Sequence, residues 1–573
     1  MADGSTATSD PLSGSNRHRS AGAEAGRPGS GGVAHRTPVD LLTTRPRTAP
    51  LGLLCALAAL VTWLIIAPRT PDLAAAAYRL DLFKHAGFAL YDEHWYGGHE
   101  LPGYSLLFPP LAWLLGLRLL AGGAALVSVA CFERLVVPRY GAAGRWASVA
   151  FALAAVGDVW IGRLTFALGV AFALAAVLAY AGGRAGGAAG PVRLLGAGVL
   201  AACSAAASPV AGVLLALAAL TESLSKRSPR ALLVLGAPAA LVALALSALF
   251  GEGGFEPFPI LSFGVTVAVV AAFALALPRD ARRLRLGAGV YLLACLAFLL
   301  LRTPMGSNVQ RYGVLLAGPL LICSLGAARA RRAPALLAAL ALVLWAVWAA
   351  WGPVRETLAV AGSPATNGAF YAPVERYLAA HTSGPVRLEV PLTRSHWEAA
   401  ELAPRVSLAR GWEKQLDERY DAPLLSPRLN ASEYERWLRQ EAIAYVALPD
   451  VQLDPSSARE GALVRAGLPY LRLVHSTPHW RIYAVRDPTP LLSGRGRLLS
   501  LGHDSFAVRA EAPGSLLLRV RYTRWFALRS GAGCVGRGAG GWTRLDAARA
   551  GVLRVHATFS LSRALGAGGS CAP

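Results

Sequence analysis

The sequence has few charged residues: 16% are Asp, Glu, Lys or Arg, whereas a soluble globular chain carries about 25%. Hydrophobic residues make up 54%, and the mean hydropathy is +0.43. Several apolar runs approach the roughly 17–25 residues that a membrane-spanning helix needs. This scarcity of charge excludes an ordinary soluble protein of 573 residues and predicts a polytopic α-helical membrane protein in contact with a lipid bilayer.

The charge that is present is mostly of one sign. The formal net charge is +22, almost all of it from Arg, and the pI is near 10.4. The Arg residues occur in short blocks between apolar runs, which is the pattern of the positive-inside rule rather than of a nucleic-acid-binding surface. We therefore expect no nucleic acid partner. Two Met residues in a chain rich in Ala, Gly and Arg indicate a GC-rich genome with an actinobacterial-like composition.

Cysteine is also scarce, and no CxxC or Cys/His spacing is present that would indicate zinc. Five of the seven cysteines lie in or near apolar runs and are expected to be small core residues. Cys534 and Cys571 alone lie in the C-terminal region. A disulfide between them and two free thiols both remain open from the sequence.

The apolar runs predict about eleven membrane crossings. They lie near 51–67, 104–137, 146–160, 164–182, 194–207, 210–224, 231–249, 260–277, 287–301, 312–328 and 334–352. Every second connection is basic (182–193, 225–230, 278–285 and 329–333), so these connections share one side, which should be the cytoplasm. The four basic connections can all face the cytoplasm only if run 104–137 makes one net crossing of the membrane. Its surplus length should form an interfacial or re-entrant piece after Pro109 and Pro110.

This alternation of basic and non-basic connections (charge parity) predicts a domain organisation. We expect a disordered cytoplasmic tail over 1–50, a transmembrane domain over 51–352 with an outer loop at 68–103, an extracytoplasmic α/β region at 353–489, and a small β-rich region at 490–573. A cleavable signal peptide is not expected, because the first apolar run begins only near residue 51. The protein should be a multi-pass plasma membrane protein with its N-terminus in the cytoplasm.

The outer loop supplies the candidate catalytic residues. Asp72 follows the first predicted helix by about five residues and is well placed to act as a general base or to hold a divalent cation such as Mg²⁺ or Mn²⁺. The alternative is that Asp72 caps a helix that begins at Pro71. Asp81 is the second candidate. The spacing of His85, His94 and His99 fits no transition-metal template.

The candidate substrate-binding residues come from several connections on the same predicted side. Guanidinium groups at a membrane surface can hold phosphate, and aromatic residues can stack on a sugar. Asp158 either joins the site or pairs with Arg163. The substrate-binding candidates are Arg163, Arg302, Asn308, Arg311, Trp95, Tyr96 and His99.

Several segments together resemble the GT-C superfamily of integral membrane glycosyltransferases. They are Asp72 after the first helix, WYGGHELPGYSLLFPPL at the end of the outer loop, GRLTFALG after Asp158, ASPVAG at 207–212, and the polar TPMGSNVQRYG turn. The chain looks closest to the bacterial branch labelled "6-pyruvoyl-tetrahydropterin synthase-related" membrane proteins. The resemblance covers most of 50–573, but the chain lacks the adjacent Asp-Asp or Glu-Asp pair that such proteins carry after the first helix.

The resemblance implies a GT-C-like fold and transfer of a sugar from a polyprenyl-phosphate donor to a cell-envelope glycan acceptor on the outer face. It implies that Asp72, or else Asp81, serves as base or metal ligand and that Arg302 or Arg311 holds the donor phosphate. Two other functions remain open: a multi-pass transporter, and a non-catalytic envelope protein whose outer region binds glycan.

Overall fold

The computed structural model describes residues 49–182, 190–327, 335–566 and 571. The predicted tail over 1–50 therefore lies almost wholly outside the described residues. The chain from Pro50 onward forms one compact unit.

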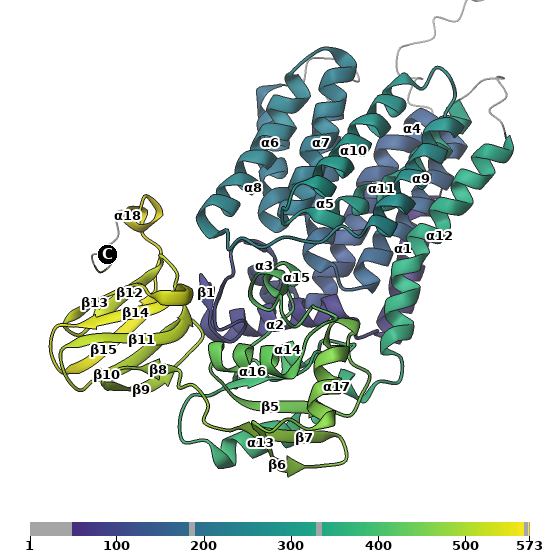
Figure 1. The fold of residues 1–573 in the computed structure, drawn as a ribbon. Helices are drawn as coiled ribbons and strands as arrows, with labels where there is room; N and C mark the ends of the chain where they lie inside the picture. The colour runs from purple at the N-terminus through teal and green to yellow at the C-terminus, as the bar shows by residue number, and fades with distance from the viewer. Residues whose placement is uncertain (1–48, 183–189, 328–334, 567–570, 572–573) are drawn as a thin grey trace, which may run out of the picture. The chain divides into compact units, whose positions relative to one another are not determined.

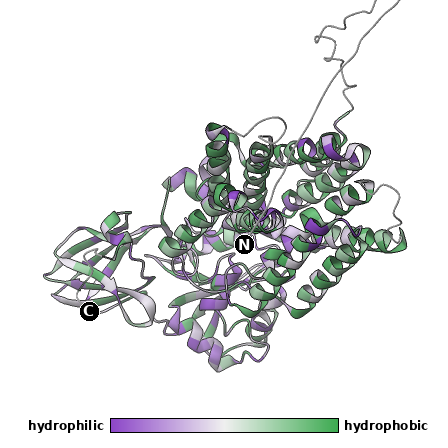
Figure 2. Cartoon of the chain, turned by 90° about the horizontal axis from the view of Figure 1, so that it is seen from above, coloured by the Kyte–Doolittle hydropathy of each residue, from purple (hydrophilic) through white to green (hydrophobic). Residues whose placement is uncertain are grey.

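Helices form the first part of this unit (Figure 1). Their bounds are α1 (Leu51–Ile66), α2 (Pro71–Ala86), α3 (Phe108–Leu115), α4 (Leu117–Trp160), α5 (Leu164–Ala181), α6 (Pro191–Ala207), α7 (Pro209–Lys226), α8 (Ala237–Phe250), α9 (Ile260–Ala276), α10 (Arg282–Leu300), α11 (Gln310–Ala327) and α12 (Ala335–Val360). Hydrophobic residues dominate these helices (Figure 2). Many large apolar side chains on them are exposed, as expected of surfaces that face lipid.

Helix α4 is a helical hairpin. Its backbone breaks at Gly141, where φ is 54° and ψ is −121°. The rings of Phe132 and Phe151 stack with their centroids 4.3 Å apart, whereas 19 residues of straight helix would separate them by about 28 Å. The two arms therefore run antiparallel and match two predicted runs. The surplus of run 104–137 forms the separate short helix α3.

Each of the eleven predicted runs contains a helix, but fewer helices meet a length criterion for crossing a membrane. Within the described residues, seven do so, or eight if α1 and α2, bent by 80°, count as one span. The difference from eleven has two causes. Helices α1, α6 and α9 have 16 or 17 residues, and the two arms of α4 are counted together. The chain is a polytopic helical membrane protein.

The region after α12 begins with a mixed five-stranded sheet in the order β4-β3-β5-β7-β6. Strand β3 (Arg387–Glu389) pairs in parallel with both β4 (Ser407–Leu408) and β5 (Ile443–Pro449). Strand β7 (Trp480–Val485) runs antiparallel to both of its neighbours, β5 and β6 (Leu471–Ser476). The helices around it are α13 (Ala372–His381), α14 (Glu398–Glu401), α15 (Lys414–Tyr420), α16 (Ala431–Gln440) and α17 (Ala458–Ala466). Strand β3 lies in the segment VRLEVPL, β5 lies in AIAYVALPDV, and α16 lies between them.

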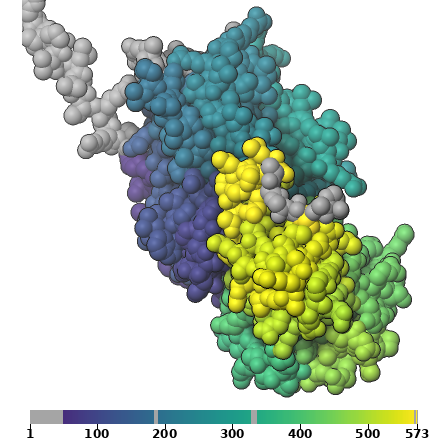
Figure 3. Space-filling model, turned by 90° about the vertical axis from the view of Figure 1, so that its left-hand side faces the viewer, coloured from purple at the N-terminus to yellow at the C-terminus, as the bar shows by residue number. Residues whose placement is uncertain are grey.

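Two four-stranded antiparallel sheets follow, in the orders β12-β15-β10-β9 and β13-β14-β11-β8. Their strands are β8 (Leu492–Ser493), β9 (Gly496–Leu501), β10 (Ser505–Ala510), β11 (Gly514–Arg521), β12 (Phe526–Ser530), β13 (Gly533–Arg537), β14 (Trp542–Ala547) and β15 (Gly551–Ala557), with a short helix α18 (Leu561–Ala564) after them. Side chains of both sheets share one core, so the predicted β-rich unit is a sandwich. It abuts the α/β region in the space-filling view (Figure 3).

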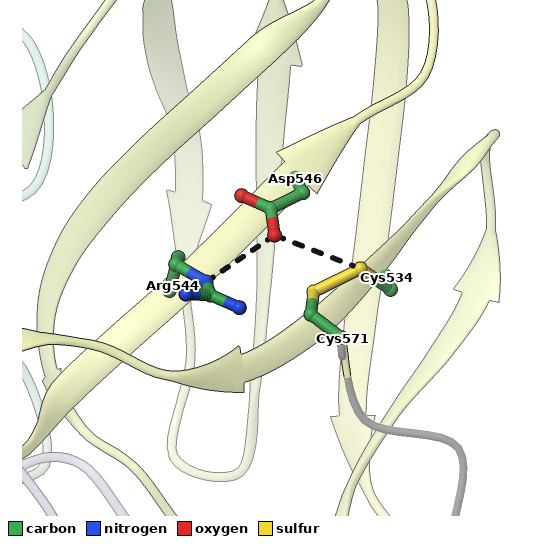
Figure 4. The surroundings of a disulfide bond; sticks show 4 residues. All are labelled: Cys534, Arg544, Asp546 and Cys571. Atoms are coloured by element: carbon green, nitrogen blue, oxygen red, sulfur yellow. Dashed lines mark hydrogen bonds and ion pairs between the residues drawn. A yellow bond between two sulfur atoms is a disulfide. The ribbon is translucent and has the colours of Figure 1, made fainter. Parts of the chain in front are cut away.

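A disulfide joins Cys534 in β13 to Cys571 and thereby ties the end of the chain to the sandwich (Figure 4). The Cys571 amide also donates to the Val535 carbonyl at 3.3 Å. Asp546, which pairs with Arg544 at 3.2 Å, lies beside the disulfide. The question that the sequence left open is answered in favour of the bridge.

Candidate functional site

Asp72 lies in the first turn of α2, directly after the 80° corner with α1. The corner is fixed at three points: the Thr70 hydroxyl donates to the Trp160 carbonyl at 3.2 Å, Arg69 pairs with Glu401 at 2.7 Å, and Arg69 stacks 3.5 Å above the ring of Trp397. The start of the predicted outer loop is thus a helix, and Asp72 is a helix-start residue. This position also suits a functional carboxylate, because the positive end of a helix dipole stabilises an anion.

Two side chains from distant parts of the chain hold the Asp72 carboxylate. Oδ2 lies 3.5 Å from Nε of Arg163, and Oδ1 accepts a hydrogen bond of 3.2 Å from the indole N–H of Trp412. Arg163 also contacts Oδ1 of Asp158 at 3.3 Å. The two carboxylates therefore share one guanidinium, which decides between the two readings of Asp158: it pairs with Arg163. The side chain of Asp72 remains 37% exposed, against 6% for Asp158.

A close backbone approach places Arg163 beside Asp72. Gly162 has a φ of 91°, in the region that favours glycine. A Cβ atom on Gly162 would lie 2.3 Å from the Leu73 nitrogen and 2.8 Å from the Asp72 carbonyl carbon. The turn between α4 and α5 can lie directly against the start of α2 because this position has no side chain.

A second group of polar residues lies within electrostatic range of this cluster. Arg311, at the start of α11, interacts with Arg163, Asp158 and Asp72. Its guanidinium donates to the side chain of Asn308 and lies 5.0 Å from the centre of the Phe166 ring.

Glu256 extends this group from the 251–259 connection. Its carboxylate accepts a 3.0 Å hydrogen bond from Ser307, and its amide donates to the Thr303 carbonyl at 3.0 Å. It also interacts electrostatically with Lys414 and Asp72. The contacts at Asp72 and at Glu256 bring connections 158–163, 251–259 and 302–308 to the same end of the helices, as charge parity predicts.

The charges of the cluster influence one another. Burial alone would lower the pKa of Arg163, but Asp158 and Asp72 reverse this and raise it, so the guanidinium keeps its charge. Burial raises the pKa of Glu256, against the effects of Lys414 and Ser307. The arrangement presents one accessible carboxylate beside fixed positive charges. It can accept a proton from a bound hydroxyl and hold an anion next to it.

The structure does not bring Asp81 into this cluster. Asp81 lies nine residues further along α2, is 42% exposed, and pairs with His85 at 3.5 Å. Arg302 is exposed and lies over the ring of Phe255, with centres 5.1 Å apart. It contacts none of Asp72, Arg163 and Arg311 through the interactions described above. Asn308 and Arg311 are therefore the better placed of the predicted residues from the 302–311 turn.

Trp95, Tyr96 and His99, which the sequence suggested as substrate-binding residues, are all fully buried. The Trp95 indole donates to the Ala399 carbonyl at 2.9 Å, and the Tyr96 hydroxyl contacts the Glu413 backbone. These aromatics lie in a hairpin formed by β1 (Tyr91–Asp92) and β2 (His99–Glu100). The hairpin packs inside the C-terminal region, so it offers no face to a sugar.

Trp412 and Glu256 are the site residues that the sequence did not reveal. Trp412 lies 340 positions after Asp72, and nothing in its local sequence distinguishes it from a core residue. Its ring stacks on His396 with centroids 3.5 Å apart, which fixes the direction of its N–H. For Glu256, the neighbouring pattern GEGGFEPFP marks only a polar connection.

The residues around Asp72 do not fit a divalent cation such as Mg²⁺ or Mn²⁺. Mg²⁺ in proteins is usually bound through one or two carboxylates together with waters and substrate phosphates, and the carboxylates must be free to face the ion. Here the guanidinium of Arg163 contacts both Asp72 and Asp158 and fills the position that a cation between them would take. The positive charge of this cluster is supplied by arginine.

Comparisons with known proteins give distant likenesses. No family model matches the chain, and no curated protein matches it. A cryo-EM structure of the arabinofuranosyltransferase AftD from Mycobacteria aligns with 81% of this chain at 18% identity and a TM-score of 0.45; the alignment covers 43% of AftD. ArnT from Cupriavidus metallidurans in the apo state aligns with 75% of this chain and 97% of its own length, at 13% identity and a TM-score of 0.40. Neither likeness is close enough to assign an activity to this chain.

Proposed function

We propose that the protein is a membrane glycosyltransferase of the GT-C type. In this proposal it moves a sugar from a polyprenyl-phosphate donor to a cell-envelope glycan acceptor on the outer face of the plasma membrane. The observation that carries the proposal is the Asp72 carboxylate. It is exposed enough to meet a substrate, yet it is held by Arg163 and Trp412 at the end of a helical membrane domain.

Each group has a role in this reaction. The acceptor hydroxyl gives its proton to Asp72, and its oxygen bonds to the anomeric carbon of the sugar as the bond from that carbon to the phosphate oxygen breaks. The lipid phosphate leaves with the electron pair. Arg311, oriented by Asn308, supports the negative charge that develops on the leaving phosphate. Arg163 and Trp412 hold the carboxylate in position for inversion at the sugar.

The orientation belongs to the same proposal. The basic connections at the far ends of the helices favour a cytoplasmic side there, so Asp72 and the region after α12 lie outside the cytoplasm. The Cys534–Cys571 disulfide supports this placement, because such bonds persist in oxidising compartments.

The test compares two carboxylates on one helix. The full-length protein and the variants Asp72→Asn and Asp81→Asn are reconstituted in liposomes with radiolabelled polyprenyl-phosphate pentoses and hexoses and a cell-envelope glycan fraction. Since a general base contributes about 10²–10⁴-fold, Asp72→Asn should lower the transfer rate at least 100-fold. Asp81→Asn should stay within twofold of wild type, because Asp81 contacts only His85 in the pairing described above.

Four outcomes would contradict the proposal or its assignment. Transfer at the wild-type rate by Asp72→Asn removes that residue as the base, and loss in Asp81→Asn alone transfers the role to Asp81. Uptake of free or lipid-linked sugar by the liposomes without any transfer favours the transporter. Saturable glycan binding by the full chain without either activity favours the assembly protein.

A further inference from the structure

Two histidines and an aspartate meet where the hairpin of the first connection touches the β sandwich. Asp92 ends β1, His94 follows in the turn, and His503 lies in the turn between β9 and β10. One ligand atom of each residue lies within 4.8 Å of the others. The two imidazole rings are 4.0 Å apart between centroids, although 409 positions separate these histidines in the sequence. This grouping is independent of the cluster at Asp72.

The three side chains are held in place by the protein. Asp92 is fully buried and His94 is 8% exposed. Asp92 Oδ2 accepts from the Tyr78 hydroxyl at 2.8 Å, and Oδ1 accepts from the His94 amide at 3.1 Å and lies 3.0 Å from Nδ1 of His503. The orientation of the carboxylate and of one imidazole is therefore set before any ligand arrives.

The hydrogen bond that His94 makes through Nδ1 leaves Nε2 as the nitrogen that can bind a metal ion. Nδ1 of His94 lies within hydrogen-bonding distance of the Ala403 carbonyl, which can only accept. Nδ1 must therefore carry the proton, and Nε2 presents a lone pair. Metal-ligating histidines in proteins almost always donate their other ring N–H to a carbonyl or carboxylate in this way.

A cavity opens beside His94, one of the three proposed ligands. It measures about 220 Å³ and is lined among others by Glu93, His94, Arg405, Ser407 and Leu501. This space can admit an ion and hold a water molecule as a fourth ligand. Two imidazoles, one carboxylate and a water form the donor set of zinc-class cations, whereas Mg²⁺ and Ca²⁺ prefer oxygen donors throughout.

We propose that Asp92, His94 and His503 bind one zinc-class divalent cation that fastens the β1–β2 hairpin to the β sandwich. The backbone already links the same two segments, since the Glu93 amide donates to the His503 carbonyl at 2.6 Å and the Arg521 amide donates to the Gly97 carbonyl at 2.7 Å. An ion bound only in the folded state adds stability to this junction in proportion to its concentration.

The test measures metal bound by the full-length, tag-free protein in detergent. After chelator treatment and dialysis against Zn²⁺, wild type should retain about one zinc per chain by mass spectrometry. Co²⁺ in its place should give the visible absorption of a four-coordinate site. His94→Ala and His503→Ala should each lower the zinc affinity at least 10-fold. His85→Ala is the matched control, because His85 is an exposed histidine of the same connection and pairs only with Asp81 in the interactions described.

His503 is only 23% exposed at its side chain but lies in a turn, so its replacement tests binding without disturbing a core strand. Gel filtration verifies the folding of each variant. Wild type without stoichiometric zinc overturns the proposal, and so does His503→Ala with wild-type affinity. If His94→Ala does not fold, the His503→Ala titration and the Co²⁺ spectrum of wild type decide alone.

Discussion

At the residue scale, the cluster at Asp72 depends on one shared guanidinium. Arg163 contacts an exposed carboxylate and a buried one, at 3.5 and 3.3 Å. The buried partner, Asp158, anchors the guanidinium, and the exposed partner, Asp72, is left with access to solvent. The difference in exposure explains why Asp158 has a structural role, whereas Asp72 is proposed to have a chemical one.

Gly162 should be the most sensitive small residue of this cluster. Gly162→Ala places a methyl group against the backbone of α2 and forces a φ of 91° on an alanine, so we expect a loss of more than about 1 kcal/mol in unfolding free energy and a displaced Arg163. Thermal unfolding in detergent measures the loss. Gly123→Ala is the control, because Gly123 is an exposed position of α4 with no atom within 4 Å of its would-be Cβ. Equal melting temperatures for the two variants would contradict the prediction.

The sequence suggested Asp72 and Arg163 as site residues but not Trp412, which holds the other oxygen of the Asp72 carboxylate. An acid after an apolar run is visible in a single chain, and so is a basic residue in the next connection. The partnership of Asp72 with Trp412 is a tertiary contact across 340 positions, and neither residue has a local pattern that predicts it. The sequence also could not show that the aromatic segment WYGGH is buried, because an interfacial aromatic and a core aromatic look alike in sequence.

At the element scale, the α/β region buries an arginine, Arg410, among four acids. Arg410, next to β4, lies 3.5 Å from Asp417 and 3.4 Å from Glu460, and it also interacts with Glu389 and Asp421. Burial raises the pKa of each of the four carboxyl groups, with Glu389 and Asp421 raised furthest. Repulsion between neighbouring carboxylates adds to the effect of burial, so both favour the protonated forms of Glu389 and Asp421 in the folded protein.

The raised pKa of Glu389 predicts that the stability of the protein depends on pH. The folded-state pKa of Glu389 lies above its unfolded value, so its contribution is fully present below about pH 4.5 and is lost as the pH rises toward and through the folded value. Glu389→Gln removes this proton linkage. Relative to wild type, the melting temperature of the variant should therefore be higher at pH 8 than at pH 5.

The control for this measurement is Glu435→Gln, because Glu435 is a half-exposed residue of α16 paired with Arg439 at 2.8 Å. Its effect should be a few tenths of a kcal/mol and should not change sign over the same pH range. A difference between Glu389→Gln and wild type that is the same at pH 5 and pH 8 would show that Glu389 does not titrate with folding.

At the scale of the whole molecule, the first connection and the C-terminal region form one packed body. Tyr78, Trp95 and Tyr96 share a hydrophobic cluster with residues from 365 to 482. Buried ion pairs cross the same boundary: Arg79 binds Glu413, and Arg387 binds Glu93 at 2.9 Å. The predicted domain limits at 352 and 353 follow composition, and composition cannot detect a hairpin that inserts into a region more than 260 positions away.

What the sequence predicted at this scale was set by local patterns. Apolar runs predicted the helices, and the region predicted to be β-rich at 490–573 contains the strands of the sandwich. The α4 hairpin also followed from two runs. The insertion of β1 and β2 depends on packing between distant segments, and the same holds for the His94–His503 contact. The histidines of the first connection, His85, His94 and His99, did not by themselves predict a metal site.

The inserted hairpin should control the stability of the region after α12. Trp95→Ala removes a fully buried ring that stacks on Tyr78 at 4.6 Å and bonds to the Ala399 carbonyl, at an expected cost of about 3–5 kcal/mol. Because the ring belongs to the shared cluster, limited proteolysis of the full chain in detergent should then cut within 372–482 at least tenfold faster. Trp113→Ala, at a position of α3 that is 59% exposed, should leave the cleavage rate unchanged. Equal cleavage of the two variants would mean that the α/β region is stable without the hairpin.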